Sequence, residues 1–241
     1  MLLIYIASAI IALAGGFCGY HPWFRLEILN KKRLLNLLLA ITAIFTLLMT
    51  GYVTGYFPQA VAAPFMTFLY SFIAGFFAGY GYRLIQLRIS SGNLLYVHRS
   101  FWIDHAPGLA AVLIMIYGIY RTSILTDDPV TAIRITSGLS LVAFGFFGFT
   151  LKIVPEFRSR GILFLDKTIP WKQILAWRWH HEDVICIEYL YKPGTQEEQV
   201  REFFTSIPGE DRAQIETVLE SKMEDARDER NQLLGLTEKH L

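Results

Sequence analysis

The chain has 241 residues, of which 53% are hydrophobic and 18% charged, and its mean hydropathy of +0.37 is higher than that of most water-soluble domains. Its net charge of +1 hides an asymmetry: residues 1–152 carry ten Lys and Arg against four acids, whereas residues 153–241 carry 12 against 17. The acidic second part argues against nucleic-acid binding by phosphate neutralisation, and two scattered cysteines exclude both a disulfide framework and a paired-cysteine metal site.

Five apolar stretches are long enough to cross a bilayer, which takes about 20 residues. The centre of each stretch contains no Asp, Glu, Lys, Arg or His. We therefore expect an α-helical bundle of five transmembrane helices within residues 1–153, surrounded by membrane lipids. The predicted spans are residues 2–20, 34–56, 66–87, 108–126 and 133–153.

Pairs of glycines four residues apart occur in the first three spans. Such pairs allow two helix backbones to approach closely in lipid, where small residues replace the hydrophobic effect as the basis of association. We expect them to serve packing within the bundle, with oligomerisation as the alternative. The pairs are Gly15 with Gly19, Gly51 with Gly55, and Gly75 with Gly79.

Basic residues gather in alternate connectors of the predicted bundle. Short loops rich in Lys and Arg stay on the cytoplasmic side of a membrane. The pattern therefore predicts a bacterial inner-membrane protein with its N-terminus outside and its C-terminus in the cytoplasm. The residues that set this orientation are Arg25, Lys31, Lys32, Arg33, Arg88, Arg99 and Lys152.

The third connector, about residues 88–107, is longer than a turn and only partly polar. Asn93 is a suitable cap for a short helix that would place Leu94, Leu95, Phe101 and Trp102 on one side. We expect this segment to form an interfacial helix on the inner leaflet.

After Lys152 the long apolar runs give way to short alternating ones separated by turn residues. This pattern predicts an antiparallel meander, and from Gly209 a helix with Ile215, Val218, Leu219 and Met223 on one face. We expect a small α+β cytoplasmic domain over residues 154–230, followed by a tail over 231–241. The predicted strands are residues 161–165, 169–179, 184–191 and 200–207.

The start of this domain carries a family resemblance. Arg160-Gly161-Ile162-Leu163 is followed by Ile169-Pro170-Trp171-Lys172-Gln173-Ile174, then by a hydrophobic strand and a closing helix. This region of about 70 residues resembles the abbreviated pleckstrin-homology-like domains that follow membrane helices in uncharacterised bacterial proteins. The resemblance implies a fold and a scaffold-like role, and it implies no reaction.

Five aromatic side chains are candidates for docking on a partner or on the inner leaflet. Trp177 and Trp179 share one face of a predicted strand, and Trp171 precedes it, so these three either form the core of the sheet or face a partner. Phe101 and Trp102 lie in the predicted interfacial segment.

Two sets of polar residues have the right chemistry to bind a metal ion, but the first has the wrong spacing and the second lacks further ligands from helix interiors or repeated motifs. The segment His180 to Asp183, with Cys186 nearby, fits a solvated hairpin turn better than a closed zinc site. His98, Asp104 and His105 fit the anchoring of an interfacial helix better than an acid–base or metal cluster. We therefore expect no metal site and no cofactor.

The sequence contains no Walker-type loop, dinucleotide fingerprint, nucleophile elbow, HExxH motif or kinase signature. The leading hypothesis is a non-catalytic membrane protein that scaffolds, assembles or regulates a complex, with a protein partner or a second copy of the chain bound through the cytoplasmic domain. The alternative is a channel or small-solute carrier between the glycine-rich helices. A weaker alternative is a lipid-modifying or haem-binding protein that uses the histidines at the inner surface.

Overall fold

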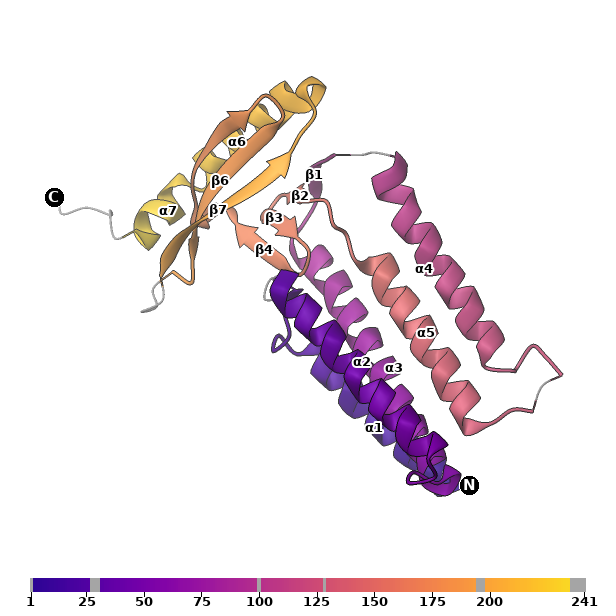
Figure 1. The fold of residues 1–241 in the computed structure, drawn as a ribbon. Coiled ribbons are helices and arrows are strands. Elements are labelled where there is room, and N and C mark those ends of the chain that lie inside the picture. The colour runs from indigo at the N-terminus through magenta and orange to yellow at the C-terminus, as the bar shows by residue number, and fades with distance from the viewer. Residues whose placement is uncertain (1, 27–30, 99–100, 128, 194–197, 235–241) are drawn as a thin grey trace. The chain divides into compact units, whose positions relative to one another are not determined.

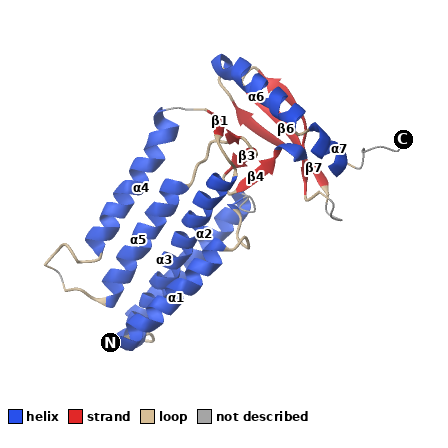
Figure 2. Ribbon diagram, turned by 180° about the vertical axis from the view of Figure 1, so that it is seen from behind, coloured by secondary structure: helices blue, strands red, loops and turns tan. Residues whose placement is uncertain are grey.

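The computed structural model describes residues 2–26, 31–98, 101–127, 129–193 and 198–234, and it divides into two compact units (Figure 1). The first comprises residues 1–86 and 101–151, and the second comprises residues 87–100 and 152–241. Figure 2 shows that the described strands all belong to the second unit, whereas the first is built from helices. Because the chain passes from one unit to the other three times, the second unit is assembled from two separate segments.

The first unit is a bundle of long apolar helices. Among the described residues, four helices are long and apolar enough to cross a membrane, namely Leu3–Tyr20, Leu35–Val53, Gln59–Ser90 and Ala132–Thr150. The fourth predicted span, residues 108–126, differs at its end, because its helix stops at Arg121. The helices are α1 (Leu2–Tyr20), α2 (Lys31–Val53), α3 (Gln59–Ser90), α4 (Phe101–Arg121) and α5 (Ala132–Thr150).

Glycines allow close contact between α1 and α3. A Cβ added at Gly15 would overlap the carbonyl oxygen of Phe72, and one added at Gly79 would overlap that of Gly16. A Cβ added at Gly19 would overlap the carbonyl oxygen of Phe76, and one added at Gly75 would overlap that of Ala12. The two backbones therefore touch where only glycine fits.

A second close contact joins α4 and α5, which lie side by side in Figure 1. A Cβ at Gly118 would lie 2.8 Å from the carbonyl oxygen of Gly138, and one at Gly138 would lie 2.5 Å from that of Gly118. These two glycines lie in different helices, twenty residues apart in sequence. A prediction from glycines four residues apart in one helix therefore did not include them.

The remaining glycine pair differs from the prediction. Gly55 lies beyond the end of α2, has a φ of +80° and has no atom within 4 Å of an added Cβ. The nearest atom to a Cβ at Gly51 is the Cβ of Phe57, at 3.7 Å. Gly55 belongs to the turn that stops α2, because glycine tolerates the positive φ of a helix-ending turn, and the pair forms no close helix contact among the described residues.

The third connector also differs from the prediction. Residues 94–97 form a strand, β1 (Leu94–Val97), whereas Pro107 lies inside α4. β1 is antiparallel to β2 (Glu156–Arg158), with Tyr96 opposite Phe157. The prediction of a helix at residues 94–97 was wrong, because this short apolar run pairs as a strand with residues about 60 positions later and buries Tyr96 there.

The second unit contains two antiparallel sheets and two helices at its C-terminal end. One sheet has the order β1-β2-β3-β4 and the other the order β5-β6-β7. The predicted meander with a closing helix is confirmed, but residues 169–179 are divided by a 3₁₀ turn that begins directly after Pro170. The further elements are β3 (Gly161–Phe164), β4 (Lys167–Pro170), β5 (Ile174–His181), β6 (Val184–Tyr191), β7 (Gln199–Ser206), α6 (Arg212–Asp225) and α7 (Arg227–Leu233).

The core of this unit lies between the two sheets and α6. The rings of Phe164 and Phe203, from β3 and β7, have centroids 4.9 Å apart. Ile215 and Leu219 of α6 are fully buried, as the apolar periodicity of this segment predicted. β1 contributes Tyr96 to the same core, so residues from the α3–α4 connector help to complete the domain.

Candidate functional site

The C-terminal end of α3 is the point where the first unit continues into the second. A helix leaves its last carbonyl groups without intrahelical partners, and the partial negative charge at this end favours nearby cations. Gly92 ends the helix with a φ of +82°, and a Cβ there would overlap the Ser159 hydroxyl. The turn between β2 and β3 therefore lies directly against the end of α3.

Two arginines of this turn bind the free carbonyl groups. Arg158 donates from Nη1 to the carbonyl oxygens of Arg88 at 3.0 Å and Gly92 at 2.8 Å. Arg160 donates from Nη1 to the carbonyl oxygen of Ser90 at 3.0 Å. The turn thus caps α3 with side chains that lie about 70 residues further along the chain.

A buried carboxylate holds Arg158 in this position. Glu156 Oε2 accepts from Arg158 Nε at 2.7 Å and lies 2.6 Å from its Nη2, and Arg88 Nε lies 3.4 Å from the same oxygen. The side chains of Glu156 and Arg158 are 9% and 11% exposed. We call Arg88, Glu156 and Arg158 the α3 clamp, because together they join the last turn of α3 to β2.

A second polar contact joins β1 to the segment before α6. The Tyr96 hydroxyl donates to Asp211 Oδ2 at 2.9 Å, and His98 Nδ1 lies 4.0 Å from the same oxygen. Burial, followed by the hydrogen bond to Asp211, raises the pKa of Tyr96 well above its usual value. The phenol therefore stays protonated and keeps donating at neutral pH.

The tryptophans proposed for docking belong to the core of the domain. Trp171 is 5% exposed, and its Nε1 donates to the carbonyl oxygen of Arg158 at 2.9 Å. Trp177 and Trp179 are partly buried against the same core. Trp179 Nε1 donates to Glu216 at 2.7 Å, a contact that, after the hydrogen bond from Arg212, lowers the pKa of that carboxyl. Core packing, one of the two roles considered for them, accounts for the burial of these side chains, and docking on a partner stays a prediction.

The other residues singled out from the sequence are dispersed. Trp102 is 75% exposed, whereas the side chain of Phe101 lies outside the described residues. Among the orientation residues, Arg88 belongs to the α3 clamp, and Arg25, Lys32, Arg33 and Lys152 are exposed. Arg99 and the side chain of Lys31 lie outside the described residues.

The histidines do not form a metal cluster in the part of the chain that the structure describes, where no three His, Cys, Asp or Glu side chains come together. His180 and His181 are exposed at the end of β5, with ring centroids 4.5 Å apart. His98 faces Asp211, and the side chain of Asp104 is not among those described.

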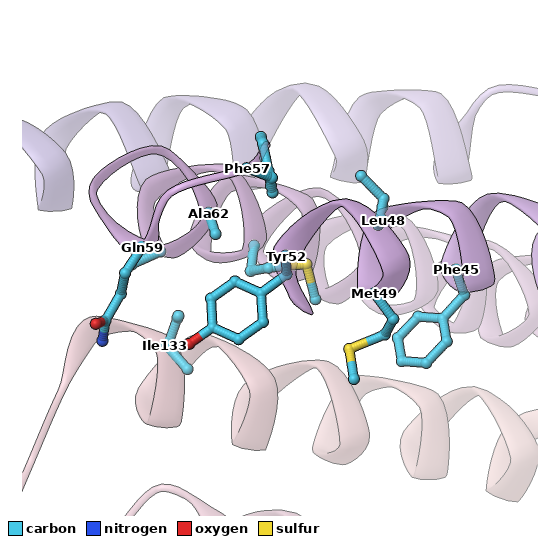
Figure 3. A pocket seen from close by; sticks show the side chains of 10 residues that line it. Phe45, Leu48, Met49, Tyr52, Phe57, Gln59, Ala62 and Ile133 are labelled. Atoms are coloured by element: carbon cyan, nitrogen blue, oxygen red, sulfur yellow. The ribbon is translucent and has the colours of Figure 1, made fainter. Parts of the chain in front are cut away.

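An apolar groove lies among α2, α3 and the start of α5 (Figure 3). Its volume is about 250 Å³, and Figure 3 shows Met49 and Tyr52 pointing from α2 toward the helix that carries Ile133. Gln59 and the Tyr52 hydroxyl supply its polar groups. The lining residues are Phe45, Leu48, Met49, Tyr52, Phe57, Gln59, Ala62, Ala63, Met66 and Ile133.

Comparison with known families gives one match, confined to the second unit. Residues 153–224 match a family described as "Domain of unknown function (DUF5673)". No curated protein and no solved structure matches the chain. The matched region begins just before β2 and ends within α6, so it does not include β1.

Proposed function

We propose that this chain is an integral protein of the bacterial inner membrane that acts, without catalysis, as a scaffold, assembly or regulatory subunit. The observation that carries the proposal is the way the second unit is built. Its β1 strand comes from between α3 and α4, and the α3 clamp joins the end of α3 to β2. A partner bound to this domain would therefore bind a unit that includes the last turn of α3.

The four long apolar helices support the membrane location. The orientation rests on Lys and Arg: the basic connectors face the cytoplasm, so the N-terminus lies outside and the domain inside. A bilayer also gives a solvent to the exposed apolar side chains of α2, whose window Leu35–Val53 has no buried residue among those described.

The domain itself is proposed to be pleckstrin-homology-like. Two antiparallel meanders closed by a C-terminal helix support this assignment, as does the β1 strand that completes the first sheet. A fold of this kind offers surfaces for binding and no reaction in itself. The proposed role is therefore to hold a protein partner or a second copy of the chain at the inner membrane surface.

The alternative role as a channel or carrier gains no support from the groove in Figure 3. Eight of its ten lining side chains are apolar, so the groove does not offer a path for a polar solute.

The experiment is purification of the full chain in mild detergent after crosslinking in intact cells. We expect a partner or a second copy in near-stoichiometric amount, and we expect a chain truncated after residue 152 to lose it. Recovery of the monomer alone, with crosslinking as well as without, would contradict the proposal.

A further inference from the structure

A polar groove of about 390 Å³ lies on the second unit beside the end of α3. It is formed by the β2–β3 turn, the segment around Trp171 and the facing ends of α6 and α7. Three basic and two acidic side chains line it, so it carries a formal charge of +1. The lining residues are Ser159, Arg160, Pro170, Trp171, Lys172, Lys222, Asp225, Ala226 and Glu229.

The charges in this groove are not equally paired. Lys172 lies 3.6 Å from Glu229, and Lys222 lies 2.5 Å from Asp225. Arg160 has no carboxylate within ion-pair distance among the described residues, and the one hydrogen bond of its side chain there goes to the backbone carbonyl oxygen of Ser90. A guanidinium group has five donors, so most of those of Arg160 remain available to an anion.

The available groups are able to bind a phosphate. A guanidinium group binds two phosphate oxygens at once, and the neighbouring Ser159 also lines the groove. The Ser159 hydroxyl accepts from the backbone N–H of Asn93 at 3.1 Å and keeps its own proton to donate. The single unmatched positive charge equals the charge of one phosphodiester. Asp225 and Glu229 would repel a dianion or a polyphosphate and would attract an amine beside the phosphodiester.

The position of the groove indicates where such a group would come from. Arg160 binds the carbonyl oxygen of Ser90, the last residue of α3, and α3 is long and apolar enough to cross a membrane. The end of a transmembrane helix lies at the level of the phospholipid headgroups. Arg160 is therefore held at that level, a step that rests on the membrane location proposed above.

We propose that this groove binds the headgroup of an amine-bearing phospholipid, with Arg160 on the phosphodiester and the two carboxylates near the amine. The site deepens the proposed function, because the bound lipid would contact the same β2–β3 turn that caps α3. Lipid composition would then bias the contact between the domain and the helix.

The test is calorimetric titration of the full chain in detergent micelles with dihexanoyl phosphatidylethanolamine and, separately, with inorganic phosphate. We expect the lipid to bind more tightly than phosphate. We expect Arg160→Gln to weaken lipid binding about tenfold or more, since it removes a charge-assisted pair of hydrogen bonds. Equal or tighter binding of inorganic phosphate would overturn the lipid as the ligand.

Arg160 also caps α3, so a second variant separates binding from folding. Glu229→Gln leaves the bond to Ser90 intact and should weaken lipid binding several-fold, because it removes one of the two carboxylates placed near the amine. Arg227→Gln is the matched control, because Arg227 pairs with Glu224 outside the groove, and it should bind like the unmodified chain. Equal affinity in all variants would refute the site. If the chain is membrane-integral but binds no lipid, this inference fails while the proposed location stands.

Discussion

The α3 clamp should contribute a large share of the stability of the β1–β2 pairing. Replacing Glu156 by Gln removes the one carboxylate shared by Arg88 and Arg158, and it leaves two guanidinium groups close together in a buried place. Breaking a buried ion pair by removing one partner costs about 3–5 kcal/mol. Arg88 is 27% exposed and the glutamine still accepts a hydrogen bond, so we expect a loss at the lower end, about 3 kcal/mol.

The assay is hydrogen exchange of backbone amides in β1 and β2, measured by mass spectrometry on the full chain in micelles. These amides exchange when the paired strands open. A loss of about 3 kcal/mol in the free energy of that opening should speed their exchange roughly a hundredfold. The matched control is Glu224→Gln, whose pair with Arg227 is 61–71% exposed and should be worth less than about 1 kcal/mol. Exchange in Glu156→Gln that is no faster than in this control would refute the reasoning.

Two further predictions concern the helices and the pH dependence of the domain. Gly79→Val should separate α1 from α3, because the added side chain would overlap the backbone of Gly16. Gly51→Ala should be tolerated, because the nearest atom to its added Cβ is 3.7 Å away. Thermal melting in detergent distinguishes the two variants, and equal melting temperatures would contradict the packing described. The pKa of Tyr96 is higher in the folded than in the unfolded chain. The stabilisation of the fold by protonated Tyr96 is therefore complete below about pH 10 and is lost as the pH rises above that value. Tyr96→Phe removes the hydrogen bond to Asp211, so it should lower the free energy of unfolding by about 1 kcal/mol at neutral pH. The variant should also lose less stability than the unmodified chain between pH 8 and pH 11, as measured by urea unfolding. An equal loss of stability in both chains would contradict this.

Long-range patterning in the sequence predicted the coarse architecture well. Apolar runs of about 20 residues located the helices, and a short apolar run between turn residues located β6 at residues 184–191. The four-residue strand Leu94–Val97 could not be found in this way, because a short apolar run fits a helix face as well as a strand. The segment is a strand because it pairs with Glu156–Arg158, about 60 residues away. No local pattern in the sequence encodes that pairing.

The candidate site was harder to predict than the fold. Arg88 was interpreted as an orientation signal, and Glu156 received no role, although the structure places both in one buried cluster. The available signal was the alternation of Glu156, Arg158 and Arg160, which puts three charges on one side of a strand and its turn. Charges on one side of a strand usually face water, so the pattern alone did not point to the end of α3.

We propose above that hydrocarbon surrounds the long helices and that the domain completed by β1 lies in the cytoplasm. Protease treatment of intact and permeabilised spheroplasts, followed by an alkaline wash of the membranes, tests both parts of this topology. We expect the C-terminal domain to be protected in intact spheroplasts and cleaved after permeabilisation, and we expect the helices to remain in the washed membrane. Cleavage of the domain in intact spheroplasts, or release of the whole chain by the wash, would contradict it.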